Sequence, residues 1–554
     1  MLPLVSTLRG YRRDTFRADL IAGLTVAVML VPQAMAYAVL AGMPPVSGLY
    51  AAIVPLAVYA VLGTSGSLAV GPVAIISLLT AAALAPLAND DPMRHATLAA
   101  TLALMVGAIQ VLLGAIRAGR LVSFLSHGVI SGFTSAAAIV IAVSQIPSLL
   151  GLEVERSESF LAQVAAIGGA IDSPDVASTV VGVGALVALL MMRRFGKRLP
   201  GPLLVVVIAT AATWALGLAD RGVSVLGEVP RGLSSPSLPA FESLAALAPA
   251  AFTIAIIGYA EGIGISKAIA ARTRQSVSPN QELVAVGAAN LAAGIFSAFP
   301  VAGGLSRTAV NHEAGSRTTV SSLVTAASLA LTVTFLTPLF TSLPKAVLAA
   351  VVVAAVLRLV DVGGATDLFG YRPWDGAVLV VTFLATLVMS VEIGLMVGVA
   401  ASIAVFLARS SQPHIAELGL MPGTGAYRNR LRYDVELDPR LLILRVDGPL
   451  FYASAQAVRD RIDLMLTGRP DTRMVVVDAS AMVDLDADGV HVLERLAEDL
   501  AIAGIGLALA TVRGPVRDLI GRSHAAPVLA DRMVPDIPAA IRRIDGQPTE
   551  DAYL

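Results

Sequence analysis

Two apolar stretches of the chain are interrupted by proline and glycine at points where a helix would otherwise continue. They read Ala69-Val-Gly-Pro-Val-Ala-Ile-Ile-Ser-Leu78 and Phe299-Pro-Val-Ala-Gly-Gly-Leu-Ser-Arg-Thr308. Proline is disfavoured inside a helix but welcome in its first turn, so we expect one helix to begin at Pro72–Val73 and another near Leu305. The first N–H groups of each helix then lack an intrahelical partner. Two such helix starts facing each other form a site for an anion.

Four polar side chains of the apolar stretches could complete this site. Arg307 stands one turn into the second helix, where a cation is unfavourable unless an anion joins it. Glu261 is the one carboxylate in its apolar stretch, and ionisable groups inside a membrane are costly and usually functional. A carboxyl group removed from water is protonated more readily, which suits a proton carried with the substrate. Gln33 can donate from its amide to an anion, and Tyr37 follows one turn later.

Each feature also has a plain structural explanation. Proline and glycine often kink membrane helices without forming a site. Arg307 could extend to the membrane interface, as we expect for Arg317. Glu261 could be a structural partner of Lys267 or Arg307. Gln33 and Tyr37 could simply pack between helices. We favour the binding site because the two interruptions occur in corresponding segments.

An internal repeat makes those segments correspond. Thr25-Val-Ala-Val-Met-Leu-Val-Pro-Gln33 is similar to Thr253-Ile-Ala-Ile-Ile-Gly-Tyr-Ala-Glu261 at a constant offset of 228 (261 minus 33). Internal repeats with interrupted helices point to the substrate site of a transporter. An odd number of crossings in each half would invert one half relative to the other. A chance similarity between apolar helices is the alternative.

The composition predicts a membrane protein with many crossings. Of 554 residues, 56% are hydrophobic and 14% are charged, and no Asp, Glu, Lys or Arg occurs between Leu20 and Asn89. A bilayer core requires about 20 apolar residues per helix, so this stretch alone holds more than one crossing. Fourteen candidate crossings follow, in two halves of seven: 18–41, 46–63, 69–87, 97–116, 123–150, 176–192, 201–219, 249–270, 283–300, 302–314, 319–341, 345–359, 374–390 and 392–409.

The distribution of charge between these crossings predicts their orientation. Cytoplasmic loops are enriched in Lys and Arg. If the N-terminus is cytoplasmic, the segments on that side hold Arg117, Arg120, Arg193, Arg194, Lys197, Arg198, Lys267, Arg272 and Arg274. The acidic Glu153, Glu155 and Glu158 then fall outside. An even number of crossings also places the C-terminus in the cytoplasm.

The chain changes character after Ser411, where nearly half of its charges lie. We expect strands at 441–446, 474–478 and 506–511 and an amphipathic helix at 489–503, which together indicate a small α/β domain. The predicted organisation is a cytoplasmic N-terminus (1–18), an all-α polytopic transmembrane transport domain (19–410), a linker (411–435), the α/β domain (436–546) and a tail (547–554).

Several function classes are excluded by what the sequence does not contain. It has no cysteine and no nucleotide-binding GxxxxGK[ST] motif, so thiol chemistry and ATP hydrolysis are excluded. His127, His312 and His414 show no ligand spacing. We therefore expect no metal, no cofactor, no nucleic-acid partner and no enzymatic activity.

Three long motifs resemble those of the sulfate permease (SulP) anion transporters. The run from Gly23 to Tyr50 is similar to the first-helix signature of that family, and Val70–Leu78 and Pro300–Asn311 are similar to its third- and tenth-helix motifs. The resemblance covers nearly the whole chain. It implies fourteen helices as a 7+7 inverted repeat divided into core and gate domains, a C-terminal STAS domain, a homodimer and elevator-like transport.

The resemblance also assigns roles to residues. It implies that substrate binds at Gln33, Tyr37, the backbone around Val73 and Ala74, and Ser306 with Arg307, beside the helix start at Leu305. Sodium-coupled bicarbonate members tend to have Asp where this chain has Glu261, so the proton is the expected coupling ion and sodium is less expected.

The combined expectation is a multi-pass inner-membrane secondary transporter that imports a small oxyanion, sulfate first, by proton symport. The alternatives are a C4-dicarboxylate or bicarbonate symporter, and a passive anion channel or a sensor whose STAS domain recruits a cytoplasmic partner.

We predict that the STAS domain has no phosphorylation switch at the start of its helix. Anti-sigma antagonists carry a phosphorylatable serine there, whereas this chain has Asp486-Ala-Asp-Gly489, with Asp488 in the serine position. A carboxylate already stabilises the helix N-terminus. Phosphopeptide mapping of protein isolated from cells should find no modification within 480–490, and phosphate on Ser480 would contradict the prediction.

Overall fold

The computed structural model describes residues 3–8, 11–89, 91–119, 126–154, 159–195, 200–227, 232, 241–273 and 275–545. The chain divides into two compact units, Met1–Ser402 and Ile403–Leu554. Some charges used for the orientation lie outside the described residues, as does the predicted tail 547–554: Arg120, Glu155, Glu158, Lys197, Arg198 and Arg274.

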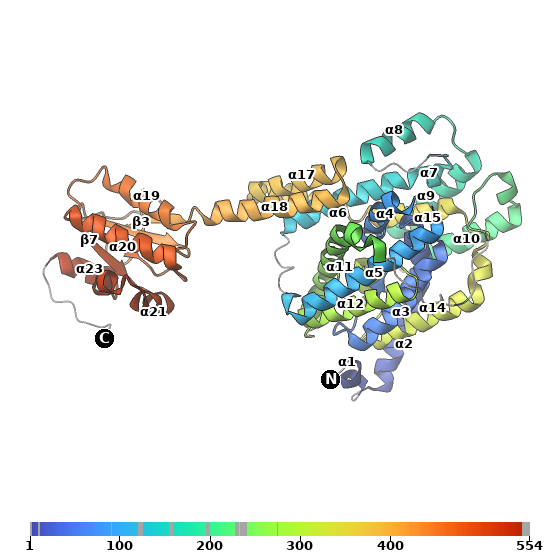
Figure 1. Cartoon of the computed structure of the whole chain (residues 1–554), viewed down its shortest axis with the longest axis horizontal. Helices are drawn as coiled ribbons and strands as arrows, with labels where there is room; N and C mark the ends of the chain where they lie inside the picture. The colour runs from blue at the N-terminus through green and yellow to red at the C-terminus, as the bar shows by residue number, and fades with distance from the viewer. Residues whose placement is uncertain are drawn as a thin grey trace. The chain divides into compact units, whose positions relative to one another are not determined.

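The first unit is built from helices (Figure 1). They are α1 (Pro3–Leu8), α2 (Arg13–Leu40), α3 (Pro45–Leu62), α4 (Ala74–Ala88), α5 (Pro92–Ala115), α6 (His127–Ser144), α7 (Ile146–Leu150), α8 (Phe160–Ala170), α9 (Val176–Phe195), α10 (Gly201–Leu216), α11 (Leu244–Thr273), α12 (Pro279–Ile295), α13 (Leu305–Glu313), α14 (Val320–Leu331), α15 (Lys345–Val356), α16 (Val362–Tyr371), α17 (Pro373–Val388) and α18 (Val391–Ser410). Two short strands, β1 (Val70–Gly71) and β2 (Ala302–Gly303), complete the unit.

A helix occupies each of the fourteen predicted stretches. Among the described residues, eight helical stretches are long and apolar enough to cross a membrane, and α4, α8, α10, α15 and α17 are apolar but shorter. The all-helical membrane unit is therefore confirmed, while the number of fourteen crossings stays a prediction. The sequence analysis did not anticipate α8 and α16, which lie between predicted crossings.

The internal repeat reappears as a repeated order of elements. The first half runs α2, α3, β1, α4, α5 and the second runs α11, α12, β2, α13, α14. Corresponding helices of the two halves also pack on corresponding helices of the other half. The second helix after the break in the first half, α5, packs on α11 and α12, and its counterpart α14 packs on α2 and α3. This reciprocity is what a two-fold relation between the halves requires.

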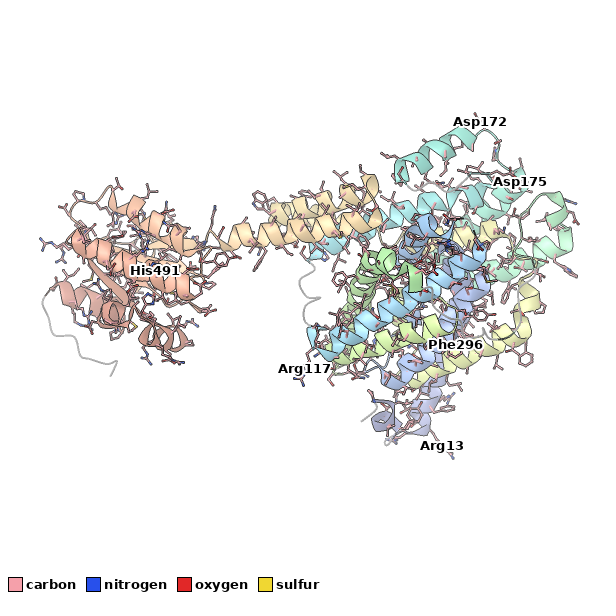
Figure 2. All side chains as sticks on the ribbon, viewed as in Figure 1. Arg13, Arg117, Asp172, Asp175, Phe296 and His491 are labelled. Atoms are coloured by element: carbon pink, nitrogen blue, oxygen red, sulfur yellow. The ribbon has the colours of Figure 1, made fainter. Side chains whose placement is uncertain are left out.

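Charged residues mark two opposite ends of the first unit. Figure 2 shows Arg13 and Arg117 at one end, and Asp172 and Asp175 at the other. The apolar helices run between these ends, so the separation follows the predicted difference between cytoplasmic and external loops. Which end faces the cytoplasm stays a prediction.

Two buried carboxylates tie the halves together near the helix ends. Asp19 of α2 is fully buried and accepts hydrogen bonds from the backbone N–H groups of Arg317 (2.7 Å) and Thr318 (3.1 Å), just before α14. It also accepts from the hydroxyls of Thr318 (2.5 Å) and Tyr11 (2.8 Å). Glu282 of α12 accepts from Tyr59 and from Thr64 and Ser65 in the same manner.

The second unit holds a six-stranded sheet of order β4-β3-β5-β6-β7-β8. Its strands are β3 (His414–Leu420), β4 (Tyr427–Asn429), β5 (Leu441–Asp447), β6 (Met474–Asp478), β7 (Gly506–Ala510) and β8 (Met533–Val534). The strands from β5 to β8 are parallel, and β3 pairs antiparallel with both β4 and β5. The helices are α19 (Ala455–Leu466), α20 (Ala487–Ile502), α21 (Gly514–Arg522), α22 (Ala526–Leu529) and α23 (Ile537–Ile544).

Alternation along the strands builds two hydrophobic layers in this unit. Leu442 and Leu444 of β5 face a core shared with α19, α20 and α21, whereas Leu441 and Ile443 face a second core shared with α23. The small α/β domain is thereby confirmed, with the predicted strands in place. The predicted helix at 489–503 begins earlier, at Ala487, because Asp486 caps it by accepting a hydrogen bond from the N–H of Gly489 at 2.8 Å.

The predicted linker at 411–435 is wrong. It contains β3 and β4, which are hydrogen-bonded into the sheet. Polar residues along β3 disguised the strand, because Glu417 is buried in ion pairs with Arg430 and Arg469.

We predict that Asp19→Ala destabilises the first unit, since it leaves the N–H groups of Arg317 and Thr318 without their acceptor. The expected loss is roughly 1–3 kcal/mol for each buried donor left unsatisfied. Thermal unfolding of the detergent-solubilised protein measures it. The control is Asp14→Ala, which removes an exposed carboxylate from the same helix, and equal melting temperatures for the two variants would contradict the prediction.

Candidate functional site

The two interrupted segments meet as a pair of short strands. β1 and β2 are antiparallel, with Val70 opposite Gly303 and Gly71 opposite Ala302. The pairing continues on one side, where the Gly304 N–H donates to the Ala69 carbonyl at 3.0 Å. Backbone polar groups removed from water need partners, and here each broken segment supplies them to the other.

A helix starts directly after each strand, as the sequence predicted. The N-terminal cap residues are Val73 for α4 and Gly304 for α13, both in extended conformation, and neither provides a side-chain hydrogen bond to its helix within the described structure. The helix expected at Pro72–Val73 begins at Ala74, because Pro72 belongs to the extended segment and its carbonyl accepts from Arg307 instead.

Arg307 joins the two segments from within α13. Its side chain is 1% exposed, and its Nη1 donates to the Pro72 carbonyl at 2.6 Å. Its Nε and Nη2 have no hydrogen-bond partner among the described residues. The guanidinium lies against the backbone of Gly304, where an added Cβ would come within 2.6 Å of Nη2. Two donors of a buried cation are therefore free to bind a ligand.

Helices α2 and α11 flank these helix starts in corresponding ways. Both pack on α4 and α13. Gln33 and Tyr37 of α2 are 3% and 6% exposed. The Glu261 carboxylate on α11 lies within electrostatic range of the Arg307 guanidinium. The structure thus brings the matched positions of the internal repeat to the same place.

Unsatisfied polar atoms gather on these four helices. Within the described residues, fourteen buried side-chain nitrogen or oxygen atoms have no hydrogen-bond partner, and eight of them belong to α2, α4, α11 and α13. They are Gln33 Oε1, Ser77 Oγ, Glu261 Oε2, Ser266 Oγ, Arg307 Nε and Nη2, Asn311 Oδ1 and His312 Nδ1. Buried polar groups normally have partners, so the unsatisfied atoms of Gln33, Glu261 and Arg307 are available to a ligand.

The predicted binding residues differ in how far they enter this site. Val73 and Ala74 are buried, and Ser306 is half-buried at the start of α13. Leu305 is 39% exposed. Their role in binding an anion stays a prediction.

Sequence reasoning missed the residues that hold the broken segments in position. The side chain of Asn290 on α12 binds both backbone groups of Val301. It accepts a hydrogen bond from the N–H at 2.8 Å and donates one to the carbonyl at 3.0 Å. Gln110 of α5 accepts from the Asn290 amide at 3.0 Å. Thr308 Oγ1 accepts from the N–H of Ala69 at 3.1 Å. The available signal was an amide side chain inside each of two apolar stretches.

A cavity of about 950 Å³ lies along α4, beginning about one turn after the start of that helix. It includes Leu78 of α4 and Leu40 of α2 but none of the predicted binding residues. Helices α2, α4, α5 and α11 line one part of it, and α6, α8 and α17 line the other. The cavity therefore lies where two groups of helices meet.

Comparison with known families gives two matches along the chain. Residues 16–382 match the sulfate permease family, and residues 432–540 match the STAS domain. The first match contains both strands, α4, α11 and α13, and α2 from its fourth residue onward.

Curated relatives are similar over most of their length. Sulfate transporter 4.1, chloroplastic, from Arabidopsis thaliana is 38% identical over 100% of this chain and 84% of the relative. A probable sulfate transporter of Mycobacterium tuberculosis is 37% identical over 98% of this chain and 97% of its own. High affinity sulfate transporter 2 of Stylosanthes hamata is 32% identical, over 95% and 83%.

Solved structures share the fold. The murine Solute Carrier 26 family member A9 anion transporter in its inward-facing state aligns with a TM-score of 0.92 at 25% identity, over 99% of this chain and 94% of that one. The transmembrane domain of a cyanobacterium bicarbonate transporter, BicA, aligns with a TM-score of 0.63 at 24% identity, over 71% and 98%.

We predict that Gly304→Ala lowers anion affinity at least about tenfold. The new Cβ would clash with the Arg307 guanidinium, and close-packed interiors relieve such a clash by displacing the side chain. Binding of sulfate, the anion expected from the sequence, is measured calorimetrically on detergent-solubilised protein.

The matched control is Gly264→Ala on α11, one turn after Glu261, where an added Cβ meets nothing within 4 Å in the described structure. It should bind sulfate within about twofold of wild type. Equal affinities for the two variants would show that Gly304 does not position the arginine.

Proposed function

The chain belongs to the sulfate permease family, and from this premise we propose that it imports sulfate by proton symport through an elevator-type movement. It is a multi-pass membrane transporter of anions rather than an enzyme. The observation that carries the proposal is the pairing of two uncapped helix N-termini beside a buried, partly unsatisfied arginine.

This arrangement has the electrostatics that a small anion requires. Each helix N-terminus is equivalent to roughly half a positive charge, and Arg307 adds a full one. Glu261 is the acidic group within electrostatic range of Arg307. A tetrahedral oxyanion presents acceptors in several directions, so it can accept from the N–H groups that begin α4 and α13 and from the free Nε and Nη2 of Arg307.

Import of a dianion needs a coupled cation. Moving one charge against a membrane potential costs about 2.3 kcal/mol per 100 mV, so a dianion entering a cell with a negative interior is opposed by roughly 4.6 kcal/mol. We assign the coupling to Glu261, whose buried Oε2 has no partner among the described residues. Protonation of this carboxyl group would remove its repulsion toward the arriving anion. Sodium is the less favoured coupling ion.

An elevator-type path is supported by how the helices group around the cavity. The strand pair and its flanking helices α2, α4 and α11 form one group, and α6 and α17 of the other group face them across the cavity. We propose that the first group moves as a body along the second and carries the bound anion with it. The proposed setting is an inner-membrane homodimer with both termini in the cytoplasm and a STAS domain that can recruit a partner.

We predict that proteoliposome uptake of radiolabelled sulfate separates binding from coupling. Wild-type uptake should rise several-fold under an inward proton gradient. Glu261→Gln should lose this stimulation yet retain sulfate–sulfate exchange, which shows that the variant is folded and binds substrate. Arg307→Ala should lose both activities, because it removes the fixed charge and the free donors of the site.

The matched control is Arg317→Ala, which removes an exposed arginine ten positions further along and should behave as wild type. All variants are checked for monodispersity by size-exclusion chromatography. Uptake that is independent of the gradient in every variant would point to a channel and overturn the proposal. Equal stimulation of Glu261→Gln and wild type would place the coupling elsewhere.

A further inference from the structure

Two histidines and a glutamate converge on the surface of the C-terminal unit. His491 and Glu494 lie three positions apart on α20 and therefore on one face of that helix, and His524 follows the end of α21. Figure 2 shows His491 on the C-terminal unit. Their ligand atoms all lie within 4.8 Å of one another, the one group of three such residues to do so in the described part of the chain.

We propose that His491, Glu494 and His524 bind a divalent metal ion, for which Zn²⁺ is the best match. This site is separate from the transport site and does not depend on the proposed function. The expectation that the chain holds no metal rested on His127, His312 and His414, and it did not extend to His491 and His524.

The distances fit a shared ion. Glu494 Oε2 lies 2.9 Å from His524 Nε2 and 3.6 Å from His491 Nδ1. Zn²⁺ binds imidazole nitrogen and carboxylate oxygen at about 2.0–2.2 Å, so neighbouring ligands of a tetrahedral ion lie roughly 3.3–3.6 Å apart. Both contacts are within a few tenths of an ångström of that separation. The ligand nitrogens of the two histidines lie within 4.8 Å of each other, so a shared ion would draw them closer together.

The donors also suit Zn²⁺ chemically. Imidazole and carboxylate ligands are typical of zinc, whereas magnesium prefers oxygen ligands alone. In the metal-free protein, the contact at 2.9 Å is a hydrogen bond between His524 and Glu494. A neutral imidazole carries its proton on either nitrogen. With the proton of His524 on Nδ1, its Nε2 offers a lone pair to the metal.

The position of the group gives the ion a defined structural effect. His491 and Glu494 belong to α20, whose buried face lies in the larger core of the unit, while His524 belongs to the connection between α21 and α22. The two histidine side chains are 49% and 64% exposed, and Glu494 is 15% exposed. An ion can therefore reach the site without unfolding it, and the fourth ligand position would face water. Bound metal would fasten α20 to that connection.

Titration of the full-length protein tests the proposal. The chain is purified in detergent with an affinity tag that contains no histidine, treated with EDTA and desalted. Calorimetric titration with Zn²⁺ should show one saturable site per chain, and Mg²⁺ should not compete. His491→Ala, Glu494→Gln and His524→Ala should each weaken binding at least about tenfold, since even changes outside the ligand shell typically cost about 10–100-fold.

The matched control is His414→Ala. His414 Nδ1 lies 2.9 Å from Asp447 Oδ2, so this pair reproduces the histidine–carboxylate contact in the same unit without a third ligand. The variant should bind Zn²⁺ as wild type does. All four positions are at least partly exposed, and size-exclusion profiles confirm that the variants fold. Absence of a saturable site in wild type, or unchanged affinity in the three ligand variants, would overturn the proposal.

Discussion

The need to satisfy backbone polar groups inside a membrane is the constraint on which the transport unit depends. A chain in lipid must form its hydrogen bonds within the protein, and helices do so by themselves. The segments before α4 and α13 leave the helical conformation, and the antiparallel pairing of β1 with β2 supplies the missing partners. The pairing serves the extended residues but not the helix starts that follow them. The backbone N–H groups at the starts of α4 and α13 stay available to a ligand. The same geometry therefore satisfies the extended backbone and creates a binding site.

Arg307 would make the two uncapped helix starts selective for an anion. A buried cation is costly unless its donors are satisfied, yet only Nη1 has a partner within the described residues, the Pro72 carbonyl. That bond holds α13 against the segment before α4. Gly304 permits it by lacking the side chain that would collide with the guanidinium. The remaining guanidinium donors and the two helix N-termini all carry positive charge. A bound oxyanion would neutralise that charge. Stability and affinity are thus opposed at this arginine, while hydrogen bonds from Asn290 to Val301 and to Gln110 hold the second broken segment in place.

Features that depend on local sequence were predictable, and features that depend on distant partners were not. Proline and glycine mark the helix starts at Ala74 and Leu305 because their effect on the backbone is local. The internal repeat relates Gln33 to Glu261 from the sequence alone. The grip of Asn290 on Val301 spans two elements, and an amide in an apolar helix has several possible partners. The start of α4 moved past Pro72 for a similar reason, since the carbonyl that would begin the helix is used by Arg307.

In the C-terminal unit, too, features that depend on distant partners could not be predicted from the sequence. Its parallel strands were recognisable because buried strands are continuously apolar, whereas β3 was not, because its buried Glu417 is neutralised by arginines from two other segments. The cluster of His491, Glu494 and His524 could not be predicted from the sequence for the same reason. The pair His491 and Glu494 has helical spacing, but the third member, His524, comes from beyond the next strand and helix. Spacing reveals ligands only within one element, while a fold assembles them across elements. A search for sites by motif therefore favours sites built by a single helix or loop, and those completed by tertiary structure need the coordinates.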